Sequence, residues 1–287
     1  MKFLIILVAL AVEFNARGAR AWLKASWIGR WLAVLAPHAE RYAGWRGPWA
    51  ALIVAGPPLI LLALVLGWLA GTSPLLWTLF SLVCLVWSLG PDDLERAIAD
   101  YRMRRGDLSP PGEDFGVERS TLDLGPPRGD STFLAQRDAL GALAVAAERA
   151  WYAPIFWFFV AGPLGCVAYR TCALMGREMA IPMAARAALA QGFEVLDWLP
   201  ARLSVFGFGL VGTLVPVLEG LREFGLWRLG NNAAVIARGA LAASDYGRVH
   251  DVMDEALALY HLNQTHALLR RTLVVWLVGI ALATLLA

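Results

Sequence analysis

Long apolar runs separated by charged segments make up the hydrophobic pattern of this chain. An apolar helix of about 20 residues is long enough to cross a bilayer. In lipid a helix satisfies all of its own backbone hydrogen bonds, so helices are the usual membrane-spanning element. The pattern therefore predicts an all-α fold, a polytopic integral membrane helical bundle with cytoplasmic helical segments. We expect membrane spans at about 48–70, 75–90, 153–175, 203–220 and 270–287.

The remaining segments are also expected to be helical, within a single domain that covers residues 1–287. Residues 1–12, a basic start and an apolar run, resemble a signal peptide. Because no convincing cleavage site follows them, we interpret them as a retained N-terminal helix. Residues 14–47 mix tryptophan with basic residues, which is typical of an interfacial helix but also fits a packed juxtamembrane helix. We expect a cytoplasmic helical insert at 91–151 and a second polar helical segment at 221–269.

Composition and charge narrow the possible partners and cofactors. The chain is 59% hydrophobic, above the usual range of about 45–50% for soluble domains, so the lipid bilayer is its main expected partner. A net charge of +2 is too small to indicate nucleic acid as a partner. Cys84, Cys166 and Cys172 lie in apolar segments and have neither a disulfide pattern nor zinc spacing. We therefore expect no metal, no cofactor and no catalytic residue of a known motif.

The central stretch from Trp151 to Phe206 contains the main irregularity of the sequence. Gly162 and Pro163 interrupt its first apolar run, and Arg170 lies inside that run. A proline in a membrane helix frees a backbone carbonyl, which then needs a partner from a neighbouring helix or a wet cavity. An arginine inside a span indicates a functional site by default, although an arginine near a helix end can also extend to the headgroups.

Other charged and amide residues can complete a polar cavity with Arg170. Asp92 and Asp93 begin a helix after the second span, where capping and solvation explain them more simply than a site does. Arginine pairs well with carboxylate or phosphate, so the cavity would bind an anionic ligand. Alternatively, these charges form internal ion pairs that only hold the helices together. The candidate ligand-binding residues are Arg170, Arg202, Asp197, Glu13, Asp92, Asp93, Arg96 and Asn232.

The run at 203–220 is rich in glycine, which favours close approach of helices. Gly207 and Gly212 lie on this run, and a glycine face exposed to lipid would support a homodimer. Lysine and arginine are concentrated in 13–47, 91–151 and 221–271. The positive-inside rule therefore predicts that these three segments lie in the cytoplasm.

Several motifs in and around the central stretch carry a resemblance to a known superfamily. It joins the bacterial membrane protein family AmpE to the cobalamin-pathway enzyme family CbiB, also called CobD. The sequence resembles the AmpE branch more closely. The CbiB branch carries acidic and Asn-bearing motifs that are missing here around Glu148 and after Arg170. The resemblance rests on 153–157 (Ala-Pro-Ile-Phe-Trp), 162–165 (Gly-Pro-Leu-Gly), 169–170 (Tyr-Arg) and 199–203 (Leu-Pro-Ala-Arg-Leu), with support from 89–108 and 232–233.

The resemblance implies a regulatory protein of the bacterial inner membrane, spanning it several times. It implies a role in β-lactamase induction and in sensing cell-wall status, through binding of a ligand such as an anionic wall fragment, or of a partner, rather than through catalysis. Two alternatives stay open. One is a CbiB-like cobinamide-phosphate synthase that forms an amide bond on a corrinoid, and the other is a structural membrane partner protein.

Overall fold

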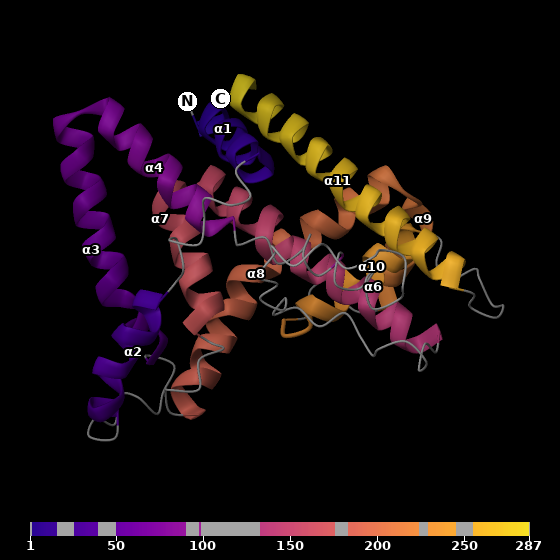
Figure 1. The fold of residues 1–287 in the computed structure, drawn as a ribbon, viewed down its shortest axis with the longest axis horizontal. Coiled ribbons are helices and arrows are strands. Elements are labelled where there is room, and N and C mark those ends of the chain that lie inside the picture. Colours follow the sequence, from indigo (N-terminus) through magenta and orange to yellow (C-terminus); the bar gives the residue numbers. More distant parts are fainter. Residues whose placement is uncertain are drawn as a thin grey trace, which may run out of the picture. The chain divides into compact units, whose positions relative to one another are not determined.

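A computed structural model of the chain describes residues 2–15, 26–39, 50–89, 98, 133–175, 183–223, 229–244 and 255–286. These residues form helices and short turns, without a strand among them, which confirms the all-α prediction (Figure 1). Three of the described helices are long and apolar enough to cross a membrane: Leu52–Thr72, Gln136–Met175 and Leu259–Leu286. The membrane-helix prediction is therefore confirmed for the part of the chain that the structure describes.

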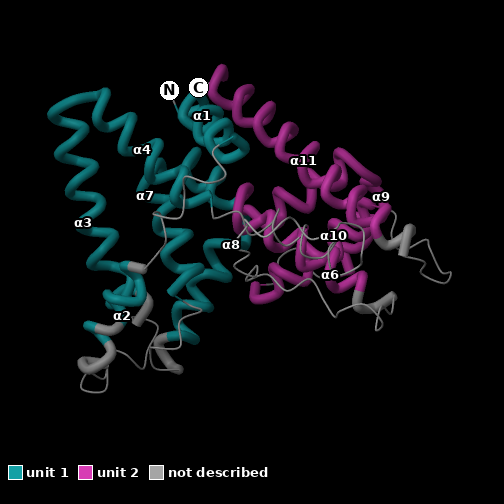
Figure 2. The backbone as a smooth tube through the Cα atoms, in the orientation of Figure 1, with its two compact units in different colours: residues 1–89, 153–199 teal, residues 90–152, 200–287 magenta. Residues whose placement is uncertain are grey.

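The chain folds as two compact units that alternate along the sequence (Figure 2). Unit 1 comprises Met1–Leu89 and Ala153–Leu199, and unit 2 comprises Gly90–Tyr152 and Pro200–Ala287. Each unit is thus built from two separate pieces of the chain, and the single domain expected over residues 1–287 stays a prediction.

Unit 1 contains α1 (Lys2–Asn15), α2 (Ser26–Ala39), α3 (Ala50–Thr72), α4 (Pro74–Ser88), α7 (Ala153–Met175) and the first part of α8 (Met183–Val211). Helices α1, α2, α3 and α4 all contact α7. Helices α3 and α4 form a hairpin, in which Ser73 caps α4 and Pro74 occupies its first turn, where a missing N–H costs nothing. The predicted spans at 48–70 and 75–90 correspond closely to these two helices.

Unit 2 contains α6 (Phe133–Ala147), the π-helical turn η3 (Glu148–Tyr152), the end of α8, α9 (Leu214–Glu223), α10 (Asn232–Ala243) and α11 (Glu255–Leu286). Helix α10 contacts α6 and α9, and α11 contacts α6 and η3. Helix α6 continues through η3 into α7, so part of the segment predicted as a cytoplasmic insert belongs to a long apolar helix. The last span likewise begins before residue 270, at Glu255.

The predicted span at 203–220 is broken in the structure. Helix α8 ends at Val211 and α9 begins at Leu214. At the break, the Thr213 backbone N–H donates to the Ala243 carbonyl (3.2 Å) and its hydroxyl donates to the Ala242 carbonyl (2.8 Å). Because the last carbonyls of a helix have no partner within the helix, Thr213 caps the C-terminal end of α10.

Three prolines inside the helices each free a carbonyl group that accepts a hydrogen bond from a donor on another helix. Pro58 has no N–H, so the Val54 carbonyl loses its bond within α3. The indole Nε1–H of Trp31, on α2, donates to that carbonyl at 3.0 Å. The proline therefore creates an acceptor that fixes α2 against α3.

The same arrangement occurs at the kink of α7. Gly162 has φ 68° and ψ −157°, a conformation that is essentially restricted to glycine. Pro163 follows it and frees the Phe159 carbonyl, which accepts a hydrogen bond from Lys2 Nζ of α1 at 3.0 Å. The predicted interruption at Gly162 and Pro163 is thus confirmed, and it lies where α1 contacts α7.

A third carbonyl of this kind lies on α8. Pro200 frees the Leu196 carbonyl, which accepts from the Trp157 indole Nε1–H of α7 at 3.2 Å. A proline in each of three helices is therefore matched by a donor from a different helix. This confirms the expectation that the freed backbone groups have partners within the protein.

Glycines in unit 2 allow the close helix approach that the sequence predicts. A Cβ at Gly207 would lie 2.9 Å from Thr272 Cγ2 on α11, and one at Gly239 would lie 2.5 Å from Val205 Cγ1 on α8. A Cβ at Gly212 would lie only 2.3 Å from the Ala243 carbonyl oxygen. Gly207 is buried by this packing within one chain, so it offers no exposed face. The homodimer stays a prediction.

Candidate functional site

In unit 1 a buried tyrosine and a buried aspartate form a hydrogen-bonded pair. The Tyr169 hydroxyl, on α7, donates to Asp197 Oδ1, on α8, at 2.6 Å. Asp197 is fully buried, and Phe193, one turn before it, stacks on the Tyr169 ring with centroids 5.2 Å apart. Because Asp197 is buried, this hydrogen bond from the Tyr169 hydroxyl helps to offset the cost of removing its carboxyl group from water.

Arg170 and Glu13 also belong to unit 1. Arg170 is half-buried on α7, directly after Tyr169, and it is not isolated from other groups. Glu13 lies on the buried face of α1 together with Ile5, Ile6, Ala9 and Leu10. A carboxylate on an apolar face is uncommon, because burying its charge is costly unless another group compensates it.

In unit 2 a buried arginine bonds to a buried asparagine. Arg202 Nη1, on α8, donates to Asn232 Oδ1 at the start of α10. Both side chains are buried among apolar helices. Of the candidate residues predicted from the sequence, the structure thus brings together two in this unit.

The turn η3 contains a buried carboxyl group that is not among the candidate residues predicted from the sequence. Glu148, the first residue of the π-helical turn, is fully buried, and Tyr152 at its end donates its hydroxyl to the Leu269 carbonyl on α11 at 2.6 Å. Single π-helical turns occur frequently at functional sites. A lone glutamate within an apolar run is the signal that could have identified Glu148, whereas the wider turn has no marker in the sequence.

The other candidate residues either lie outside the described residues or are divided between the two units. Asp92, Asp93 and Arg96 lie outside the described residues. Asp197 belongs to unit 1 and Arg202 to unit 2, so the single cavity expected from the sequence stays a prediction. Among the residues that the structure describes, no group of three or more His, Cys, Asp or Glu side chains could hold a metal ion.

Residues 1–219 match the family described as "Regulatory signalling modulator protein AmpE". The chain belongs to the AmpE family. The matched range includes the Tyr169–Asp197 pair and Arg202, while Asn232 and helices α10 and α11 lie after it. Comparison with curated proteins and with solved structures gave no match.

The family and the three apolar helices together show a regulatory membrane protein. This confirms the resemblance to AmpE that the motifs of the central stretch indicate. Those motifs coincide with features of the structure. Residues 162–165 contain the kink of α7, and 199–203 contain both Pro200 and the buried Arg202.

Proposed function

We propose that this AmpE-family protein modulates β-lactamase induction in response to cell-wall status, by binding an anionic wall fragment rather than by catalysis. The observation that carries the proposal is the buried Arg202 and its hydrogen bond to Asn232. The family supports the regulatory role, and the arginine supports the anionic character of the ligand.

Burying an arginine side chain has a large energetic cost. Removing a guanidinium from water costs several kcal/mol, so ionisable groups inside membrane helices commonly mark functional sites. A guanidinium has five N–H donors, and a carboxylate or phosphate can accept two of them in a bidentate pair. An anionic ligand therefore fits the chemistry of Arg202.

We expect an Arg202→Met variant to need about 10–100-fold more inducer for half-maximal β-lactamase expression. The estimate follows from the loss of a hydrogen bond to a charged group, worth about 1.5–3 kcal/mol, at 1.4 kcal/mol per tenfold change. The measurement is an induction curve in an inducible bacterial strain whose own copy of the gene is deleted. Membrane protein levels are measured in parallel by immunoblotting.

Arg222→Met is the matched control, because Arg222 is exposed on α9 of the same unit. Arg202→Lys keeps the charge but removes the bidentate geometry, so it should fall between the wild type and Arg202→Met. Arg170→Ala tests the corresponding idea in unit 1. An unchanged induction curve for Arg202→Met at normal protein levels would contradict a ligand site at this arginine.

We also propose a multi-pass inner-membrane location in which the basic loops within 13–47, 91–151 and 221–271, outside the long apolar helices, face the cytoplasm. The charge distribution supports this orientation. A single cysteine placed at Thr72, after removal of the native cysteines, should react with a membrane-impermeant thiol reagent on intact spheroplasts. A cysteine at Ser109 should react only after lysis. The reverse pattern would overturn the orientation.

A further inference from the structure

Helices α6, α8, α9 and α10 of unit 2 enclose a cavity of about 390 Å³. Pockets for small ligands have volumes of about 300–1,000 Å³, so this cavity can hold part of a lipid-sized molecule. Much of its lining is aliphatic, with Val205, Val217, Leu221 and Val235 contributing side chains. This lining therefore favours binding of an apolar group.

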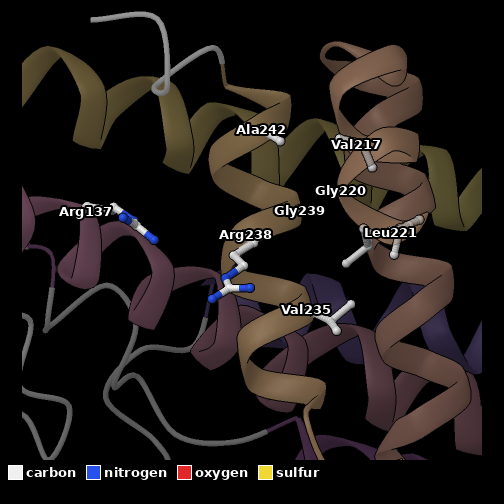
Figure 3. A pocket seen from close by; sticks show the side chains of 9 residues that line it. Arg137, Val217, Gly220, Leu221, Val235, Arg238, Gly239 and Ala242 are labelled. Carbon is white, nitrogen blue, oxygen red and sulfur yellow. The ribbon is translucent and has the colours of Figure 1, made fainter. Parts of the chain in front are cut away.

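The charged side chains that line this cavity are both arginines. Arg137 comes from α6 and Arg238 from α10. Figure 3 shows their guanidinium groups on one side of the pocket and Val217 and Leu221 on the other. Arg137 is half-buried and Arg238 is exposed, so a ligand group can reach the charges from outside. The cavity is thus divided into a cationic part and an apolar part.

The helices that form the apolar wall also carry large exposed apolar side chains. On α8, Leu203, Phe206 and Leu210 are exposed at helical spacing, while Val205 faces the cavity. On α9, Val215 is 65% exposed, while Val217 lines the cavity. Extended exposed apolar faces are rare on soluble proteins and indicate contact with lipid in a membrane protein. The cavity therefore lies on helices that border acyl chains.

We propose that this cavity binds an anionic phospholipid. Its phosphate group pairs with Arg137 and Arg238, and one acyl chain occupies the space between α8, α9 and α10. Arginine pairs with phosphate through short, charge-assisted hydrogen bonds. Basic pockets between membrane helices are known to select anionic headgroups. Neither Arg202 nor Asn232 lines this cavity, so the proposal does not depend on the function proposed above.

The test uses the full-length protein in a neutral detergent and measures its thermal unfolding temperature while a lipid is titrated. The probes are phosphatidylglycerol, phosphatidylcholine with the same acyl chains, and glycerol phosphate without chains. We expect phosphatidylglycerol alone to raise the unfolding temperature in a saturable manner. Phosphatidylcholine lacks the net negative charge, and glycerol phosphate lacks the apolar part.

Two variants test the two parts of the cavity separately. Arg137→Gln combined with Arg238→Gln should raise the half-saturating phosphatidylglycerol concentration at least ~10-fold, because charge-assisted bonds are lost. Gly220→Leu should raise it similarly by filling the cavity, since a Cβ at Gly220 meets nothing within 4 Å and strains no neighbour. Arg271→Gln, on the exposed face of α11, is the control and should behave as wild type.

Each contrary outcome overturns the proposal. Equal stabilisation by phosphatidylcholine would show general lipid solvation, and equal stabilisation by glycerol phosphate would show a simple anion site. If Gly220→Leu leaves the titration unchanged, the acyl chain does not enter the cavity. If the double arginine variant responds as wild type does, the headgroup does not bind there. If the double arginine variant fails to fold, Arg238→Gln alone replaces it, and if Gly220→Leu fails to fold, Gly220→Ala replaces it; each should show a smaller shift in the same direction.

Discussion

Replacing Trp31 with phenylalanine is expected to lower the free energy of unfolding by about 1–3 kcal/mol. The substitution keeps an aromatic ring but removes the indole N–H that reaches the Val54 carbonyl at 3.0 Å. A buried backbone acceptor left without its donor costs about 1–3 kcal/mol, and Pro58 prevents α3 from satisfying it internally. Thermal unfolding of the detergent-solubilised protein measures the effect.

The explanation predicts a specific dependence on Pro58. In a Pro58→Ala background, the alanine N–H can bond to the Val54 carbonyl, so Trp31→Phe should become nearly neutral. The coupling between the two substitutions is the quantity that tests the idea. Trp68→Phe is the control, because Trp68 is 65% exposed on α3, the helix that carries Val54 and Pro58. If the two effects are simply additive, the carbonyl freed by the proline is not what Trp31 stabilises.

Replacing Tyr169 with phenylalanine should also destabilise the protein, by about 1.5–3 kcal/mol, the usual contribution of a hydrogen bond to a charged group. The change removes the hydroxyl that donates to the fully buried Asp197 at 2.6 Å and leaves the ring packing on Phe193 intact. Thermal unfolding in detergent again provides the measurement. Phenylalanine keeps the aromatic ring against Phe193, so the contribution of ring packing to stability should stay the same.

An Asp197→Leu background separates this bond from general packing. There the acceptor is gone, so Tyr169→Phe should have little further effect. Tyr260→Phe serves as the control, since Tyr260 is 56% exposed on α11. An equal loss of stability from Tyr169→Phe in both backgrounds would show that the hydroxyl acts through some other group.

Part of this fold follows directly from the sequence. Apolar runs give the hairpin α3–α4, and Gly162 with Pro163 gives the kink in α7. The positions of the prolines also predict which carbonyl groups need a hydrogen-bond partner. The identity of each donor is not, because Lys2 and Phe159 are 157 positions apart and only the packed structure brings them together.

The candidate site could be predicted less completely. Arg202 and Asn232 were identifiable from the motifs at 199–203 and 232–233, and they do bond to each other. Arg137 and Arg238 lie on separate helices in short polar interruptions, where solvation is the simpler explanation for an arginine. Glu148 interrupts an apolar run, but that run lies at the end of the segment 91–151 that was predicted to be a polar insert, so its burial was not expected. In each case tertiary packing supplies the information that local patterns lack.

The alternation of the two units has a consequence for biosynthesis. The ribosome releases Met1–Leu89 first, yet unit 1 also requires Ala153–Leu199, and Gly90–Tyr152 must wait for Pro200–Ala287. The early hairpin α3–α4 is therefore synthesised before α7, the helix that both of its members contact. Neither half can mature while the nascent chain is short, and a fragment cut at any single internal bond would leave at least one unit incomplete.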